Sequence, residues 1–183
     1  MTTPQLFTVT LIVTYLILAM VIWSLAVPRH RIWPPPRRKS WQYHLYWWFF
    51  YIDTALSLWL LARDWNTWCL PDPLRFFVGV PLLLLGAAFS LWAIIALGWG
   101  NTYGRAQGFT DRGPYQFTRN PQYVGDMVML AGLMLWANSV DAGVILLLII
   151  LTFALMPLPE EQWLPGHYGD TYQAYKASTP RFL

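Results

Sequence analysis

Residues 6–27 read LFTVTLIVTYLILAMVIWSLAV, a run of 22 residues that contains no charged side chain. A helix that crosses a bilayer needs about 20 predominantly apolar residues, so this run predicts a transmembrane helix. No Lys or Arg precedes the run and five follow it, which is the reverse of the charge pattern of a cleaved signal peptide. We therefore expect the helix to be retained.

Four more apolar runs follow: Tyr43–Ala62, Phe76–Leu97, Tyr123–Ala137 and Val140–Met156. The last two are shorter, and only Asn138 and Ser139 separate them. They predict a tight helical hairpin, with one long core helix pair as the alternative. The fold predicted for residues 1–183 is thus a single all-α integral membrane domain with about five transmembrane helices.

The composition supports a membrane location. Hydrophobic residues make up 56% of the chain and charged residues only 11%, whereas a soluble domain carries about 25% charged residues. Several Trp and Tyr residues stand where apolar runs end, as expected for rings at the membrane–water interface. The single cysteine, Cys69, excludes an intrachain disulfide.

The distribution of Lys and Arg predicts the orientation. If the five runs cross the membrane in turn, ten of the twelve cations fall on one side and two on the other. The positive-inside rule then places the N-terminus outside and the C-terminus in the cytoplasm. This asymmetry accounts for the net charge of +3, and we expect no nucleic-acid partner.

Two polar segments, 98–122 and 157–183, lie on the predicted cytoplasmic side and flank the hairpin. We expect them to meet at one membrane face. Pro121 suits the first turn of a helix and disfavours helix at Asn120, so Asn120 is expected to cap the fourth helix. Such a helix start attracts a carboxylate or phosphate, and Arg119 adds a cation beside it. The alternative is a capped helix with Arg119 extended to lipid headgroups.

Four sequence blocks in these segments carry a family resemblance. They are Gly-Pro-Tyr at 113–115, Arg-Asn-Pro-Gln-Tyr-Val-Gly at 119–125, the Glu pair at 160–161, and Tyr-Gly-x-x-Tyr-x-x-Tyr-Lys at 168–176. Their order and spacing resemble the integral membrane methyltransferases related to isoprenylcysteine carboxyl methyltransferase and to phospholipid N-methyltransferases. The resemblance covers residues 97–183.

The resemblance implies that S-adenosylmethionine binds in region 97–183, on the cytoplasmic face of a membrane such as the bacterial inner membrane. It implies Glu160 and Glu161 as acidic ligands of the cofactor. Gly98 and Gly100 resemble the glycines of a cofactor motif, and close helix packing is the alternative for them. The complete set of expected cofactor-binding residues is Gly98, Gly100, Tyr115, Arg119, Asn120, Pro121, Tyr123, Glu160 and Glu161.

Two carboxylates lie within apolar runs, Asp126 and Asp53. A carboxylate in the membrane costs several kcal/mol unless it is paired or wetted, so each is a candidate functional group. We expect Asp126 and Arg119 to be catalytic, with Asp126 as the base for an amine acceptor. The alternative is a carboxylate hydrogen-bonded to a neighbouring helix. His167, a lone interfacial histidine, is expected to be structural, and no metal site is predicted.

The predicted activity is transfer of a methyl group from S-adenosylmethionine to a lipophilic or small nucleophile. That acceptor is a phospholipid amine, an isoprenylcysteine-like carboxylate or a thiol. Related carboxyl methyltransferases carry an Arg four residues before the Glu pair, and this chain has Met156 there, which disfavours a carboxylate. Tyr-Val-Gly-Asp at 123–126 is also similar to membrane sterol reductases. An NADPH-dependent sterol or enone reductase, or a non-catalytic membrane component, is therefore the alternative.

Overall fold

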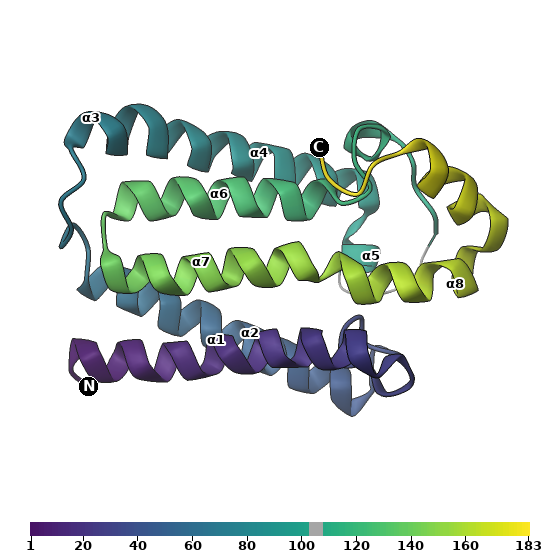
Figure 1. Ribbon diagram of the computed structural model, residues 1–183, viewed down its shortest axis with the longest axis horizontal. Coiled ribbons are helices and arrows are strands. Elements are labelled where there is room, and N and C mark those ends of the chain that lie inside the picture. The colour runs from purple at the N-terminus through teal and green to yellow at the C-terminus, as the bar shows by residue number, and fades with distance from the viewer. Residues whose placement is uncertain (103–107) are drawn as a thin grey trace.

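A computed structural model describes residues 1–102 and 108–183, and all regular structure in these residues is helical (Figure 1). The long helices follow the apolar runs of the sequence, and short helical turns lie in the connections. In chain order the elements are α1 (Thr3–Ala26), η1 (Pro28–His30), α2 (Trp41–Arg63), α3 (Asp72–Leu74), η2 (Arg75–Gly79), α4 (Val80–Leu97), α5 (Trp99–Thr102), η3 (Gly113–Gln116), α6 (Pro121–Ala137), α7 (Val140–Leu155) and α8 (Pro157–Ser178).

Within the described residues, four helical stretches are long and apolar enough to cross a membrane. They are Thr3–Ala26, Trp41–Arg63, Asp72–Leu97, which joins α3, η2 and α4, and Val140–Ser178, which joins α7 and α8. The protein is therefore an integral membrane protein. α6 has 17 residues, at the lower limit for a spanning helix, and is not among the four. The fifth span and the orientation stay predictions.

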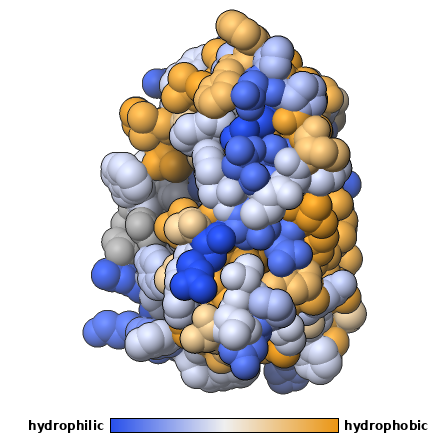
Figure 2. All heavy atoms as spheres, turned by 90° about the vertical axis from the view of Figure 1, so that its left-hand side faces the viewer, coloured by the Kyte–Doolittle hydropathy of each residue, from blue (hydrophilic) through white to orange (hydrophobic). Residues whose placement is uncertain are grey.

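The helices α1, α2, α4, α6 and α7 lie alongside one another along the long axis of the molecule (Figure 1). The α1–α2 connection, residues 108–120 and α8 gather at one end of this bundle. The α2–α3 and α6–α7 connections lie at the other end. Figure 2 shows that second end, where hydrophilic side chains form a band between hydrophobic margins. The bundle thus has two polar ends and an apolar middle.

Asn138 and Ser139 fix the end of the bundle where α6 connects to α7. Asn138 ends α6 in the left-handed conformation, with φ of 52°. Its side-chain amide donates to Asn66 Oδ1 at 2.7 Å, and its Oδ1 accepts from the backbone of Leu70 at 3.0 Å. Ser139 then caps α7 by accepting from the backbone of Ala142 at 3.0 Å. Asn138 and Ser139 therefore join α6 to α7 and hold the α2–α3 connection against them.

α4 and α6 approach each other at backbone distance because both carry glycines at their contact. A Cβ on Gly125 would lie 2.5 Å from the backbone nitrogen of Ser90. A Cβ on Gly132 would lie 2.2 Å from the backbone nitrogen of Leu83. Small residues are how membrane helices gain close packing without a hydrophobic driving force. This contact positions Asp126, the residue after Gly125, against Ser90 Oγ at 2.6 Å.

We predict that Gly125→Ala destabilises the protein, because backbone atoms of α4 occupy the space of the new methyl group. Overpacking of this kind costs about 1–3 kcal/mol. The measurement is the free energy of unfolding in detergent micelles. Gly166→Ala is the matched control, because a Cβ on Gly166 meets nothing within 4 Å. Equal stability of the two variants would contradict a close α4–α6 contact.

Candidate active site

A cavity of about 240 Å³ lies at the end of the bundle where α6 begins, α7 ends and α8 begins. The α1–α2 connection, the start of α2 and residues 108–110 complete its wall. These parts are far apart in the sequence, and the antiparallel course of the helices brings them together. Aromatic residues make up nearly half of its lining, and the charged groups among the described lining residues are Arg119, Asp126 and Glu160.

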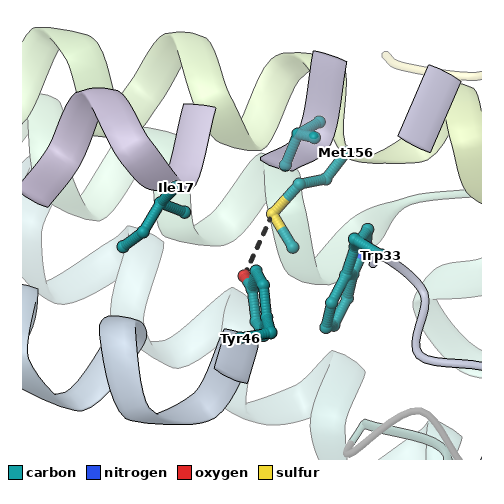
Figure 3. Close-up of a cluster of buried hydrophobic side chains, with 5 residues drawn as sticks. Ile17, Trp33, Tyr46 and Met156 are labelled. Atoms are coloured by element: carbon teal, nitrogen blue, oxygen red, sulfur yellow. Dashed lines mark hydrogen bonds between the residues drawn. The ribbon is translucent and has the colours of Figure 1, made fainter. Parts of the chain in front are cut away.

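Glu160 lines the cavity, and two hydrogen-bond donors hold its carboxylate in place. The indole Nε1 of Trp33 donates to Glu160 Oε1 at 2.7 Å, and the hydroxyl of Tyr123 donates to the same oxygen. Figure 3 shows Trp33 beside Tyr46 and Met156, with the Tyr46 hydroxyl 3.7 Å from the sulfur of Met156. Glu160 is thus fixed at the edge of a buried apolar cluster.

Arg119 is the basic group of the cavity wall. Its side chain is only 9% exposed, and Nη2 lies 3.4 Å from Glu161 Oε1. Nε and Nη1 of Arg119 are buried and have no hydrogen bond of normal geometry among the residues that the structure describes. The guanidinium interacts with the hydroxyl of Tyr172, which also lines the cavity. A buried donor without a hydrogen bond costs free energy, so an anionic group bound beside this guanidinium would be stabilised.

Glu161 holds Arg119 in place through an ion pair. Its carboxylate forms a two-point ion pair with Arg181, with Nε–Oε1 at 2.9 Å and Nη2–Oε2 at 2.8 Å. The hydrogen bond to Glu161 raises the pKa of the Arg181 guanidinium. Glu161 does not line the cavity. The adjacent acids Glu160 and Glu161 therefore have different surroundings, a cavity wall and an ion-pair cluster.

The C-terminal segment closes this cluster over the start of α6. The backbone nitrogen of Arg119 donates to the carbonyl of Pro180 at 2.9 Å. The carbonyl of Arg181 accepts from Thr118 Oγ1 at 2.9 Å and from the side-chain amide of Asn120 at 3.0 Å. These bonds fix residues 118–120 immediately before the helix.

Asn120 stands at the N-cap position, as predicted, but its side chain does not cap the helix. The side-chain amide of Asn120 instead donates to the backbone carbonyl of Arg181, because the C-terminal segment brings that carbonyl within reach. The expected capping hydrogen bond is therefore absent at this described residue. The start of α6 still borders the cavity, since Asn120, Gln122 and Tyr123 line it.

Tyr115 and Tyr175 connect the segment before α6 to α8. The hydroxyl of Tyr175 donates to the carbonyl of Tyr115 at 2.7 Å, and both rings line the cavity. Burial, followed by the nearby Glu160 carboxylate, raises the pKa of the Tyr115 phenol. Tyr115 therefore stays a neutral phenol in the wall.

Asp126 stands between this cavity and a second one. It accepts from Ser90 Oγ at 2.6 Å and lines both cavities. The second cavity, of about 340 Å³, lies between α1, α2, α6 and α7, and Asp53 lines it. Asp53 accepts from Thr14 Oγ1 at 2.6 Å, so this carboxylate is hydrogen-bonded to a neighbouring helix.

The structure brings most of the predicted site residues to the first cavity. Its lining includes Tyr115, Arg119, Asn120, Tyr123, Asp126 and Glu160. The remaining predicted residues do not line it: Gly98, Gly100, Pro121 and Glu161. Gly98 ends α4 with φ of +83° and open space around it, so it serves a turn rather than close helix packing. His167 stacks on Trp163, with ring centroids 4.8 Å apart, and does not line the cavity.

Sequence reasoning missed the contribution of the N-terminal half. Trp33, in the α1–α2 connection, binds Glu160 across 127 residues of chain. Tyr46 and Trp47 of α2 line the same cavity. Arg31 lies over the ring of Trp163 at 5.4 Å. The stiff Pro34-Pro35-Pro36 stretch beside Trp33 was the available signal, since it indicates a connection with a fixed course.

The fold and the site together define an integral membrane protein with a mixed-charge pocket at one end of its helix bundle. The family model described as phospholipid methyltransferase matches residues 74–171, more than half of the chain. The protein belongs to this family of membrane methyltransferases, as the sequence blocks indicated. Comparisons with curated proteins and with solved structures give no match.

The matched residues coincide with the site. They run from α3 through α8 and include Arg119, Tyr123, Asp126 and Glu160. Trp33 and Arg181 lie outside the matched region, although both contact its acidic residues. The family places the chain among transferases.

We predict that Glu161→Gln destabilises the protein, because it leaves the buried Arg119 cation without its carboxylate. Removal of one partner of a buried ion pair costs about 3–5 kcal/mol. The free energy of unfolding in detergent is the measurement. Asp170→Asn is the control, because it removes an exposed acid from the same helix. It should change the free energy of unfolding by less than about 0.5 kcal/mol. A stability of Glu161→Gln equal to that of the control would contradict the ion-pair cluster.

Proposed function

We propose that the protein transfers the methyl group of S-adenosylmethionine to the amine of a lipophilic acceptor at the cytoplasmic face of the membrane. The observation that carries this proposal is the buried Arg119 guanidinium, with two nitrogens that lack a hydrogen bond of normal geometry among the described residues, in an aromatic cavity that also holds Glu160. Family membership supports the reaction class.

Arg119 suits the carboxylate of the cofactor's methionine part. Arg and carboxylate form charge-assisted hydrogen bonds of about twice the strength of neutral ones. Nε and Nη1 are donors without a hydrogen bond of normal geometry among the described residues, and Glu161 already holds Nη2. The start of α6 beside Asn120 adds favourable backbone N–H groups for the same charge.

The rest of the cavity suits a cation. Aromatic rings attract sulfonium and ammonium groups through their faces, and Trp is the strongest of them. Trp33, Tyr46 and Trp163 line the cavity, and Glu160 supplies a negative charge among them. Bound here, S-adenosylmethionine supplies a methyl group activated by its positive sulfur. The protein then contributes alignment, which is the largest gain for a displacement reaction.

The acceptor is an amine rather than a carboxylate in this proposal. A carboxylate acceptor would need its own cation, since an unpaired buried charge is costly. Arg119 is the single Lys or Arg among the described lining residues, and the cofactor occupies it. Met156 is 2% exposed and packs in the core with Trp33 and Tyr46, so it supplies no charge.

Asp126 is the proposed base. An amine that is protonated as an ammonium group must lose that proton before its nitrogen can attack a methyl group. Asp126 is the carboxylate that lines both cavities. Ser90 orients it through Oγ at 2.6 Å. The proton would pass from the amine nitrogen to this carboxylate.

The alternative of a nicotinamide-dependent reductase has less support. Its cofactor carries several phosphate charges, and NADPH requires a basic site for the 2′-phosphate. The described lining offers one Arg, together with the acids Glu160 and Asp126. A non-catalytic membrane component would have no use for a buried cation in the cavity wall.

The test is binding of S-adenosylmethionine to Arg119→Ala, measured by calorimetry in detergent or nanodiscs. We expect affinity to fall by about 1–3 kcal/mol, the value of hydrogen bonds to a charged group. Arg112→Ala removes an exposed arginine a few residues away and should bind like the wild type. Wild-type affinity in folded Arg119→Ala would reject the assignment.

A further inference from the structure

The second cavity has a polar site deep between its helices that the proposed reaction does not use. Its wall comes from α1, α2, α6 and α7 and is largely apolar. Thr14 and Asp53 form a hydrogen-bonded pair at 2.6 Å, and Ser57 follows Asp53 by four residues on the same face of α2. These polar groups therefore form one patch on an otherwise apolar wall.

Ser57 is the group in this patch that requires an explanation. The residue is 7% exposed, and its buried Oγ has no hydrogen-bond partner among the described residues. A neighbouring hydroxyl provides the contrast, because Thr54 lines the same cavity and donates to the carbonyl of Phe50 at 2.8 Å. A buried polar group without a partner is costly, so Ser57 is suited to a polar group of a ligand.

The two cavities share part of their wall. Tyr46, Phe50, Gln122, Asp126 and Phe153 line both of them. Leu58, which is 59% exposed, also lines the second cavity, so its wall reaches the outer face of α2. A lipid chain can therefore occupy the second cavity while its head lies beside Asp126.

We propose that the second cavity binds the chain of the lipid acceptor and that Asp53 and Ser57 recognise a hydroxyl group carried on that chain. This inference rests on the proposed function, since it takes the head of the same molecule to be the methyl-accepting amine. A hydroxyl can donate to the Asp53 carboxylate and accept from Ser57 at once, whereas a plain methylene satisfies neither.

The fold sets the position of that hydroxyl. Asp53 lies seven residues beyond Tyr46 on α2, which is about 10 Å along the helix axis at 1.5 Å per residue. Tyr46 belongs to the shared wall, near the reacting end. The recognised hydroxyl therefore stands near the middle of a long chain rather than beside the amine.

The test compares three radiolabelled probes in nanodiscs by equilibrium binding: hexadecylamine, 10-hydroxyhexadecylamine and 2-hydroxyhexadecylamine. We expect the 10-hydroxy probe to bind about three- to tenfold more tightly than the plain amine, the ratio for one net hydrogen bond. The 2-hydroxy probe has the same polarity and should show no such gain. Equal binding of the three probes, or no binding, would overturn the inference.

Two variants connect the preference to the polar patch. Ser57→Ala and Asp53→Ala, each of which removes the hydrogen-bonding group, should reduce the preference for the 10-hydroxy probe to less than about twofold. Thr54→Ala removes a hydroxyl that is already satisfied and should retain the preference. A preference that survives in both patch variants would contradict the inference even if one of them were unstable.

Binding and methyl transfer separate the two proposals. Transfer of labelled methyl to hexadecylamine without any preference for the 10-hydroxy probe would support the proposed function and reject the hydroxyl site. A preference in binding without methyl transfer to any amine would support the site and reject amine methylation.

Discussion

The carboxylate of Glu161, held between Arg181 and Arg119 inside the protein, is the interaction on which the site depends. Its two-point bond to Arg181 ties the C-terminal segment to α8, and the same segment binds residues 118–120 through backbone carbonyls. Arg119 is thereby held with Nη2 beside Glu161, while Nε and Nη1 lack a hydrogen bond of normal geometry among the described residues. The charge that neutralises this buried cation comes from Glu161, which does not line the cavity.

The close contact of α4 with α6 performs the second half of this positioning. Gly125 allows the backbone of α6 to approach Ser90, and the next residue, Asp126, accepts from its hydroxyl. Asp126 is thereby fixed in the wall that the two cavities share. A water-soluble cofactor and a lipid acceptor would reach this carboxylate from different sides.

The sequence predicted the helices well and the residue roles less well. Apolar runs near the length of a bilayer predict spanning helices directly, and Pro121 marks the start of α6. Adjacent residues on a helix point about 100° apart, so Glu160 and Glu161 face different neighbours, which a linear pattern does not reveal. The side chain of Asn120 binds Arg181 because the tail folds back, and Trp33 reaches Glu160 from a distant connection. These partners follow from tertiary packing alone.

The central claim is methyl transfer to a lipophilic amine, and the most direct measurement follows label from methyl-labelled S-adenosylmethionine. Purified protein in nanodiscs is incubated with the labelled cofactor, a total membrane lipid extract and, in a parallel sample, a farnesyl-cysteine acid. We expect label in amine-bearing lipids and little in the acid, because Met156 supplies no cation and the proposed cofactor would take Arg119. Efficient labelling of the acid, or no labelling of any lipid, would contradict it.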